Sequence, residues 1–348
     1  MGFAIRAMQP ADLDAVSRLM VRVFPQSHSP AQWAKIMEWM YFSPSLADGR
    51  PRALVIADAH SIVGHIGCTV SPFTDGRRYL RVVNPANWVV DPDCKAGLLA
   101  VRLILEIGAA GDLVMVIGGG EQTQRIIPKL GYKEWFRVER YIKVLKPWRL
   151  LGSAPTGRAM AHNAVKLGLY WTGRVQAMAR NRHGRSTPVY QWREMDEPKA
   201  PEPIESSTTV MRNALDPQFL AWFKQCPEGS VHVLGLYDGQ QLIGHVSVLI
   251  MARGSRRWAN LLGAETWIEA PSVWSSLLNA TEEFLQGQQV THINAVGCYA
   301  PWCEALRRHG YTRLKSNPVR LRSKPGQLKD VAAWHVTAIE GDLGYLME

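Results

Sequence analysis

Two stretches of this 348-residue chain resemble each other, and this internal repeat restricts the possible folds more than any other feature. The pair Gly64-His65 recurs about 180 residues later as Gly244-His245, and both pairs lie among β-branched residues typical of a strand. Further landmarks recur at one nearly equal distance, namely Trp88 and Trp267, Pro92 and Pro271, Gly118 and Gly297, and Gly131-Tyr132 and Gly310-Tyr311. We call this distance, which is 179 residues from Gly131 to Gly310, the repeat spacing. Because the landmarks keep one order and a nearly constant spacing, we predict the duplication of one domain of about 140 residues.

The first copy shows how the repeated unit should fold. Pro10 suits the first turn of a helix, and Gly131 suits the position just after the end of one. Apolar periodicity predicts the order β-α-α-β-β-β-α-β-α-β, closing with a pair of strands within residues 134–144. The predicted fold class is therefore mixed α/β with a central, partly antiparallel sheet. We expect one domain over residues 1–147, a linker over 148–204 and a second domain over 205–348.

Composition excludes several classes of protein. Apolar residues make up 47% of the chain and charged residues 20%, which is typical of a globular protein and not of a disordered one. No apolar run reaches the roughly 18 residues that a membrane-spanning helix needs. The five cysteines form no C-x-x-C pair, which predicts reduced thiols, no metal site and a cytoplasmic location.

The excess positive charge lies in one segment. The chain carries a formal net charge of +10, and no Asp or Glu occurs between Tyr141 and Arg193. That segment holds ten of the 40 Lys and Arg residues, so the remainder has 30 basic and 30 acidic residues and is neutral. We therefore expect any anionic partner to contact the linker.

Within the linker, residues 157–182 predict an amphipathic helix. Basic residues, among them Arg158 and Lys166, lie opposite a narrow apolar stripe formed by Met160, Ala164, Leu167, Trp171, Val175 and Met178. An apolar stripe with a basic back is typical of a helix on an anionic membrane surface. A helix packed between two domains is an equally favoured alternative. Few aromatic residues separate the cations, which makes contact with nucleic acid less favoured than either alternative. Such contact stays open as a third possibility.

Three short motifs resemble the GCN5-related N-acetyltransferase (GNAT) family. Residues 5–13, Ile-Arg-Ala-Met-Gln-Pro-Ala-Asp-Leu, are similar to the usual opening of that family. Residues 88–97, Trp-Val-Val-Asp-Pro-Asp-Cys-Lys-Ala-Gly, resemble the strand and loop that hold acyl-coenzyme A, and residues 128–132, Pro-Lys-Leu-Gly-Tyr, resemble the closing element. The resemblance covers most of residues 3–147 and, more faintly, 205–345. It implies two GNAT-like domains in tandem, joined by a basic helical linker.

The resemblance implies a donor site in the first copy. Backbone N–H groups at a helix N-terminus bind pyrophosphate, and glycine permits its close approach. The residues expected to hold the donor, acetyl-CoA or a longer acyl-CoA, are Val89, Val90, Lys95, Ala96, Gly97, Leu98 and Leu99. The family pattern is incomplete, because Cys94 and Leu99 replace a leading Arg or Gln and a second small residue. Residues 270–275 of the second copy have neither glycine nor cation, which indicates a degenerate domain that shapes the acceptor site or an interface.

The catalytic residues are less well defined by the motifs. The tyrosine that the family often uses to protonate the leaving thiolate is absent, since Ile127 and Leu306 occupy the matching positions. The usual glutamate base is also absent from the first copy. Three side chains are candidates for the proton transfer, namely Asn87, Glu121 and Glu265. A surface or capping role is the alternative for each carboxylate, and a water chain also serves an amine of modest pKa.

Together these inferences predict an acyl-CoA-dependent N-acyltransferase. The expected acceptor is a small-molecule or lipid-linked amine, such as an envelope amino sugar or a sphingoid base, and no metal is required. The expected location is cytoplasmic, at the periphery of the inner membrane if residues 157–182 bind lipid. Two alternatives stay open: a Fem-type aminoacyl-tRNA-dependent transferase, and a non-catalytic GNAT-like binding or scaffold protein.

Overall fold

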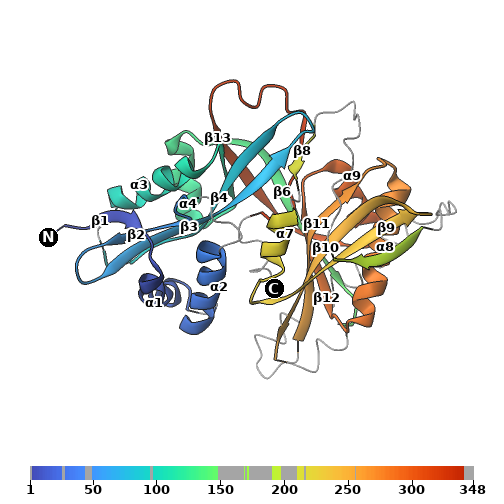
Figure 1. The fold of residues 1–348 in the computed structure, drawn as a ribbon, viewed down its shortest axis with the longest axis horizontal. Helices are drawn as coiled ribbons and strands as arrows, with labels where there is room; N and C mark the ends of the chain where they lie inside the picture. Colours follow the sequence, from blue (N-terminus) through green and yellow to red (C-terminus); the bar gives the residue numbers. More distant parts are fainter. Residues whose placement is uncertain are drawn as a thin grey trace.

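The structure, a computed structural model, describes residues 2–25, 28–43, 49–94, 97–147, 168, 171, 190–196, 210–214, 217–254 and 256–340. Within these ranges one mixed sheet of 14 strands runs through the molecule, with helices on both faces (Figure 1). The strands follow the hydrogen-bonded order β1-β2-β3-β4-β5-β13-β6-β12-β11-β10-β9-β7, while β8 pairs with β3 and β14. This architecture confirms the predicted mixed α/β class with a partly antiparallel sheet.

Both halves of the chain contribute strands and helices in a similar order. The first half comprises β1 (Ala4–Ala7), η1 (Pro10–Asp12), α1 (Leu13–Val23), α2 (Pro30–Phe42), β2 (Ala53–Ala57), β3 (Ile62–Thr74), β4 (Tyr79–Val90), α3 (Gly97–Ile107), η3 (Gly108–Ala110), β5 (Leu113–Ile117), α4 (Glu121–Ile126), η4 (Ile127–Leu130) and β6 (Lys133–Val144). The second half comprises β7 (Gln191–Met195), β8 (Val210–Asn213), α7 (Pro217–Phe223), β9 (Gly229–Asp238), β10 (Gln241–Arg253), β11 (Arg256–Thr266), α8 (Pro271–Gly287), β12 (His292–Gly297), α9 (Ala300–Arg308), β13 (Thr312–Ser323) and β14 (Ala333–His335).

Strands β6 and β13 exchange places between the two halves. β6 pairs with β12 of the second half, while β13 pairs with β5 of the first half. The exchanged strands also pair with each other, so they join the two half-sheets at the centre of the molecule (Figure 1). The prediction of two strands within residues 134–144 was wrong, because this segment is one strand whose partners belong to the other half.

The register of these ladders repeats with the spacing found in the sequence. Leu113 of β5 pairs with Ser323 of β13, and His292 of β12 pairs with Val144 of β6. The repeat spacing separates Leu113 from His292 and also Val144 from Ser323, so the two ladders correspond pair by pair. Such a match is the geometry expected of a duplicated unit.

The central β6–β13 ladder carries the same relation within itself. One extra residue bulges out of each strand, Trp135 in β6 and Leu314 in β13, and the repeat spacing separates these two positions as well. Val138 pairs with Asn317, its own counterpart at the repeat spacing, so an approximate two-fold axis passes through this pair. Bulges locally increase the twist of a strand, and here they do so symmetrically about that axis.

One landmark of the repeat does not correspond as the sequence suggested. The backbone N–H of Asp91 donates to the carbonyl of Val63 over 2.8 Å, and the N–H of Trp267 donates to the carbonyl of Ile243 over 2.9 Å. Because Val63 and Ile243 directly precede the repeated Gly-His pairs, they are counterparts, and Trp267 therefore corresponds to Asp91. The expected match with Trp88 was wrong because the second hairpin is shorter: 12 residues separate the paired Val70 and Val83, against eight between the equivalent pair Ile250 and Ala259.

The described part of the linker contains one strand of the second half-sheet. β7 lies within the predicted linker of residues 148–204, yet it pairs antiparallel with β9 as β1 pairs with β2. This pairing favours a second domain that starts near residue 190, although the domain boundaries stay a prediction. The predicted helix of residues 157–182 lies outside the described residues, except for Gly168 and Trp171, which are helical and exposed.

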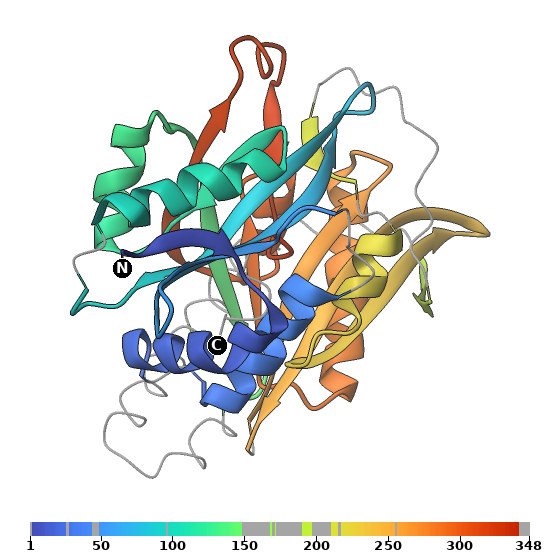
Figure 2. The same cartoon turned by 60° about the vertical axis from the view of Figure 1, so that its left-hand side comes forward.

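Helices cover opposite faces of the first half-sheet. α1 and α2 pack on one face, against Val55, Ala86 and Val89, whereas α3 packs on the other face against Ile56 and Ile66 (Figure 2). Alternate residues of a strand point to opposite faces, which is why both faces are apolar here. In the second half, α8 and α9 cover one face through a separate apolar cluster.

Two stacked tryptophans join the halves, one from α2 and one from α7. Trp39 of α2 and Trp222 of α7 stack with ring centroids 4.5 Å apart and an interplanar angle of 7°. Each indole N–H donates to the backbone carbonyl of the other tryptophan, over 2.9 and 3.0 Å. The contact therefore satisfies both polar groups while burying two large aromatic side chains.

Candidate functional site

Each half contains one place where two parallel neighbours of the sheet separate. The last paired residues are Val83 and Val114 in the β4–β5 ladder, and Asn260 and Asn294 in the β11–β12 ladder. All four strands continue beyond these pairs. The first opening is defined as the gap between residues 84–90 of β4 and the end of β5. The second opening is the gap between residues 261–266 of β11 and the end of β12.

A β-bulge lies beside each opening. In the first half, Asn87 and Trp88 both lie opposite the single residue Ile66 of β3. In the second half, Leu262 is the extra residue of β11 against β10. A bulge bends its strand, so it turns the remainder of β4 or β11 away from the parallel neighbour and widens the opening.

The first opening lies beside the residues predicted to hold the donor. Val89 is buried and Val90 is half-buried at the end of β4, and α3 begins at Gly97 after a short loop. A Cβ added to Gly97 would meet no described atom within 4 Å, so the start of α3 is open to solvent. Leu98 is 83% exposed, while Leu99 packs against the core beneath α3. The predicted residues Lys95 and Ala96 lie outside the described residues.

The loop between β4 and α3 is held by the buried Asp91. Its backbone carbonyl accepts from the N–H of Cys94 over 3.0 Å, and its carboxylate accepts from the N–H of Asp93 over 3.1 Å. Arg22 of α1 donates to the same carboxylate over 2.7 Å. Residues 91–94 are therefore held against α1 as well as β4.

Asn87, a catalytic candidate from the sequence, is part of the bulge. Its φ of 55° lies in the left-handed region, which asparagine tolerates better than most residues. Its side-chain amide donates to the Tyr41 hydroxyl over 3.0 Å, and Nδ1 of His65 lies 3.1 Å from the backbone carbonyl oxygen of Asn87. Burial lowers the pKa of His65 to about 4, which makes its ring neutral. These contacts hold the bulge in place.

Glu121, the second candidate, lies on the surface. It occupies the first turn of α4, its side chain is 79% exposed, and it pairs with Arg125 one helical turn later over 2.5 Å. An exposed pair of this spacing contributes a few tenths of a kcal/mol to a helix. Among the described residues, Glu121 contacts none that borders either opening.

The second opening contains part of the chain itself. We define the C-terminal segment as residues 333–340, which begin with β14. The backbone N–H of Ile339 donates to the carbonyl of Leu262 over 2.8 Å, and Nε2 of His335 donates to the carbonyl of Ala264 over 2.6 Å. The segment therefore uses hydrogen-bonding groups of β11 on the side where β12 has separated.

The other side of the C-terminal segment contacts the turn that follows β12 and helix α8. The thiol of Cys298 donates to the carbonyl of Trp334 over 3.1 Å. The ring of His335 lies 5.3 Å from that of Tyr299 and 6.0 Å from that of Trp274. Contacts on both sides show that this segment fills the second opening, whereas no described segment bridges the two strands of the first.

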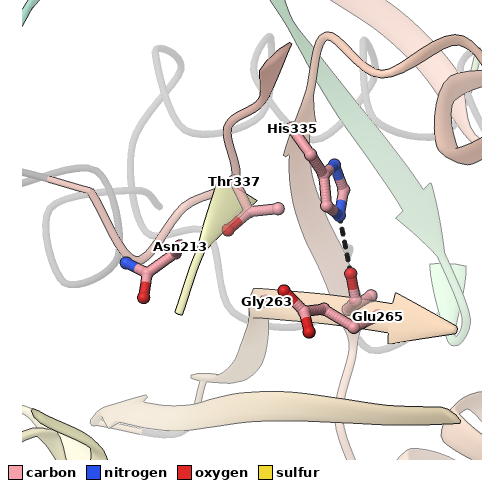
Figure 3. Close-up of a pocket in the computed structure, with 6 residues that line it drawn as sticks. Asn213, Gly263, Glu265, His335 and Thr337 are labelled. Carbon is pink, nitrogen blue, oxygen red and sulfur yellow. Dashed lines mark hydrogen bonds between the residues drawn. The ribbon is translucent and has the colours of Figure 1, made fainter. Parts of the chain in front are cut away.

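Glu265, the third candidate, faces a small recess beside the C-terminal segment. The recess is lined by Asn213, Gly263, Ala264, Glu265, His335 and Thr337 (Figure 3). The carboxylate of Glu265 points towards Asn213 and Thr337, and it forms no hydrogen bond with any described residue. Burial raises its pKa to about 7, and the charge of Arg212 opposes this change. Glu265 is therefore a buried carboxyl group that titrates near neutral pH.

The polar residues that line this recess or lie behind its walls were not found from the sequence. Glu340 is fully buried and accepts hydrogen bonds from Thr337, through its N–H over 2.8 Å, and from Asn213 over 3.3 Å. Burial raises the pKa of Glu340 to about 8 and lowers that of His335 to about 4. No motif connects these residues, because β8, β11 and the C-terminal segment meet only in the folded chain.

Metal binding and membrane crossing find no support in the described residues. No three His, Cys, Asp or Glu side chains of the described ranges gather where they could hold a metal ion. Across the same ranges, every helix is too short or too polar to cross a bilayer.

Comparison with known proteins shows the fold. No protein-family model and no curated protein matches the chain. A GCN5-related N-acetyltransferase from Anabaena variabilis has a TM-score of 0.55 and 10% identity, covering 92% of this chain and 72% of that one. A second, from Kribbella flavida, has a TM-score of 0.54 and 13% identity over the same shares of the two chains. N-myristoyltransferase from Saccharomyces cerevisiae with bound myristoyl-CoA has a TM-score of 0.53 and 11% identity, covering 93% of this chain and 84% of that one. The chain therefore has the fold of GCN5-related N-acetyltransferases and of N-myristoyltransferase.

Proposed function

We propose that this protein is a tandem member of the GNAT family that transfers an acyl group from acyl-CoA to an amine. The observation that carries the proposal is the difference between the two openings. The first is bordered by a free strand edge and by the start of α3, and a Cβ on Gly97 would meet empty space. The second is filled by the C-terminal segment. One donor, acetyl-CoA or a longer acyl-CoA, therefore binds per chain.

The first opening supplies what a thioester donor needs. Backbone N–H groups at the start of α3 bind the pyrophosphate, and the bent part of β4 offers backbone groups to the arm that carries the thioester. The amine nitrogen attacks the thioester carbonyl, the C–S bond breaks, and the thiolate leaves with the proton that the amine gives up. Positioning of the two reactants contributes most of the rate where no strong acid is present.

Of the three proton-transfer candidates, Glu265 fits the task best. Its pKa of about 7 lets it exist in both protonation states near neutral pH, which is the condition for a general base. Asn87 and Glu121 are left out of the proposed chemistry, since one holds a bulge and the other lies on the surface. The acceptor then binds between the halves. A single apolar cluster there joins Val89 of β4 to Leu262 of β11 and to Ile339.

Calorimetry with acetyl-CoA and with a long-chain acyl-CoA tests the donor site. Gly97→Val should weaken binding at least tenfold, because a β-branched side chain occupies the space that the pyrophosphate needs. The protein itself accommodates the new side chain, so the variant should fold normally. Ser272→Val, at the start of α8 in the second half, is the matched control and should bind as the wild type does. Equal affinity in both variants, or two donors per chain, would reject the assignment.

The proposal also covers the class of the acceptor and the location of the protein. Trp171 is 59% exposed, which supports an apolar contact for the helix predicted over residues 157–182. If this helix lies on an anionic membrane, replacing Arg158, Lys166, Arg174 and Arg180 by Gln should abolish sedimentation with anionic vesicles at low salt. A lipid-linked amine, such as a sphingoid base, would then be preferred to a soluble amino sugar. Unchanged sedimentation would remove this argument.

The two alternative functions, a non-catalytic binding protein and a Fem-type transferase, differ in the ligands they should bind. A non-catalytic binding protein would bind acyl-CoA without turnover, or would not bind it. A Fem-type transferase would bind aminoacyl-tRNA through the basic linker and ignore acyl-CoA. Mass spectrometry of the purified protein for bound CoA separates these cases.

A further inference from the structure

The two strands that join the halves, β6 and β13, carry a pair of cations side by side on one face of the sheet (Figure 1). Tyr141 and Lys143 of β6 face α8 and α9, since Tyr141 packs in their apolar cluster and Lys143 pairs with Glu282 of α8. Alternate residues of a strand point to opposite faces, so Arg140 lies on the other face. Lys315 of β13 is paired with Arg140 across the ladder and shares that face. We call Arg140 and Lys315 the central basic pair.

No described carboxylate neutralises the central basic pair. Arg140 is half-buried, and burial lowers the pKa of its guanidinium without any opposing charge among the described residues. The acidic partners lie on the opposite face, where Glu139 pairs with Arg313 over 2.8 Å. Like charges directly opposite on neighbouring strands destabilise a sheet, and a partly buried charge without a partner adds to that cost. The pair therefore lowers the stability of the protein on its own, as groups of a binding site often do.

The equivalent positions of the repeat show that the fold does not need charge here. At the repeat spacing, Arg140 corresponds to Val319 and Lys315 to Phe136, and these two apolar residues are also paired across the ladder. Trp334 of the C-terminal segment stacks on Phe136 with ring centroids 5.5 Å apart, and Val319 is buried. Lys315, in contrast, is exposed. One side of the approximate axis is thus apolar and covered by the chain, whereas the other is cationic and accessible.

The central basic pair lies between the first opening and Glu265. In the order of the sheet, β5 borders the first opening and is followed by β13, β6 and β12, and β11 with Glu265 comes next. Neighbouring strands are about 4.8 Å apart, so the pair lies roughly 5–10 Å from β5 across the sheet. Gly118, the residue after β5, donates its N–H to the carbonyl of Pro318 over 3.0 Å, only three residues from Lys315. A small molecule whose one end lies in the first opening can therefore reach the pair with its other end.

The chemistry of the pair selects an anion. An arginine guanidinium binds a carboxylate or a phosphate through two parallel N–H bonds, and an adjacent lysine adds a point charge. A metal cation would be repelled by both side chains, and a neutral group would leave both charges without a counter-charge.

We infer that Arg140 and Lys315 bind an anionic group, a carboxylate or a phosphate, at the end of the acceptor that is remote from its amine. This inference rests on the proposed function only in so far as the bound molecule is the acyl acceptor. It narrows either acceptor class, an amino sugar or an amino lipid, to members that also carry an acidic group. The bound anion supplies the counter-charge that the described residues do not.

A ligand-observed NMR titration of the full chain, without CoA, tests the inference with three probes of one chain length: hexylamine, ω-aminohexanoate and ω-aminohexyl phosphate. The two anionic probes should bind at least tenfold more tightly than hexylamine, and the tighter of the two identifies the anionic group. Arg140→Gln should remove this preference, and Lys315→Gln should reduce it several-fold. Lys133→Gln, an exposed cation at the other end of β6, is the matched control and should bind as the wild type does.

Thermal unfolding of the same variants separates binding from a structural role. Arg140→Gln removes a half-buried charge and its repulsion with Lys315, so it should raise the unfolding temperature by about 1–3 °C while the preference is lost. A residue that the fold requires would lower this temperature when replaced, and that result would overturn the inference.

Three binding results would also overturn it. These are equal affinity of the wild type for all three probes, an unchanged preference in Arg140→Gln, or an equal loss in Lys133→Gln. The wild-type comparison needs no variant, so a folding defect cannot obscure it. Gly97→Val should keep the preference, because the donor site takes no part in it. Since the titration contains no CoA, its failure leaves the calorimetry of the donor site standing, and the reverse also holds.

Discussion

The same position of the repeated unit carries Val89 in one half and Glu265 in the other. Val89 lies opposite His65 on β3, and Glu265 lies opposite His245 on β10, so the register makes the two residues equivalent. Val89 is 3% exposed and packs in the apolar cluster beneath α1 and α2. Glu265 instead faces the recess formed with β8 and the C-terminal segment.

This difference accompanies a second one, in what occupies the two openings. In the first half, helices cover the sheet face and no described segment fills the opening between β4 and β5. In the second half, the chain fills the equivalent opening and uses its own backbone groups there. A polar residue such as Glu265 is tolerated in the filled half because a recess remains beside it, whereas a carboxylate at Val89 would be enclosed by apolar side chains.

The largest expected effect is on the free energy of unfolding, when the contact between Trp39 and Trp222 is removed from one side or the other. Trp222→Ala should lower the free energy of unfolding by about 3–5 kcal/mol, because it removes a large buried aromatic side chain and leaves a cavity. Trp39→Ala should cost a similar amount, since each tryptophan donates to the other's backbone. Urea denaturation measures both. A difference above about 2 kcal/mol between the variants would show that the two sides of this contact are not equivalent.

Hydrogen exchange can compare the two openings directly. Saturating acyl-CoA, at about 100 times its dissociation constant, stabilises the bound state by about 2.7 kcal/mol and should slow exchange in residues 84–90 by up to 100-fold. Residues 261–266 should change little, because the C-terminal segment already occupies that opening. Equal protection of both peptides would contradict the proposal of one donor site.

Glu265→Gln should stabilise the protein, but only above acidic pH. The folded pKa of about 7 exceeds the ordinary value of 4.5, so the unfolded chain loses this proton first. Wild-type stability therefore falls as pH rises from 4.5 to 7, and the cost is complete above pH 7. The variant should gain about 3 kcal/mol at pH 8 and nothing at pH 4. Thermal denaturation at the two pH values checks this, and an equal gain at both would contradict a buried ionising carboxyl.

The smallest expected effect lies at the surface of the first half. Glu121→Gln should change stability by less than about 0.5 kcal/mol, because its pair with Arg125 is exposed. Its acyl-transfer rate should equal that of wild type under saturating donor. A loss of activity in this variant, with unchanged stability, would return Glu121 to the list of proton-transfer candidates.

The sequence by itself determined the local part of this protein. Apolar periodicity predicted the order of strands and helices in the first half, since strand and helix patterns depend on near neighbours. The repeat spacing found in the sequence also separates the equivalent residues of the β5–β13 and β12–β6 ladders. Glycines such as Gly131, with φ of 83° at a helix end, could be recognised because few other residues adopt that conformation.

Only the tertiary structure decided which strands pair across the halves and which opening stays free. β6 looked like a self-contained strand pair because nothing in its own residues shows that its partners are β12 and β13. The surroundings of Glu265 were likewise absent from the sequence pattern, because burial by β8 and the C-terminal segment raises its pKa. Such contacts depend on residues far apart in the chain, whose meeting is set by the packing of the whole sheet and leaves no local pattern.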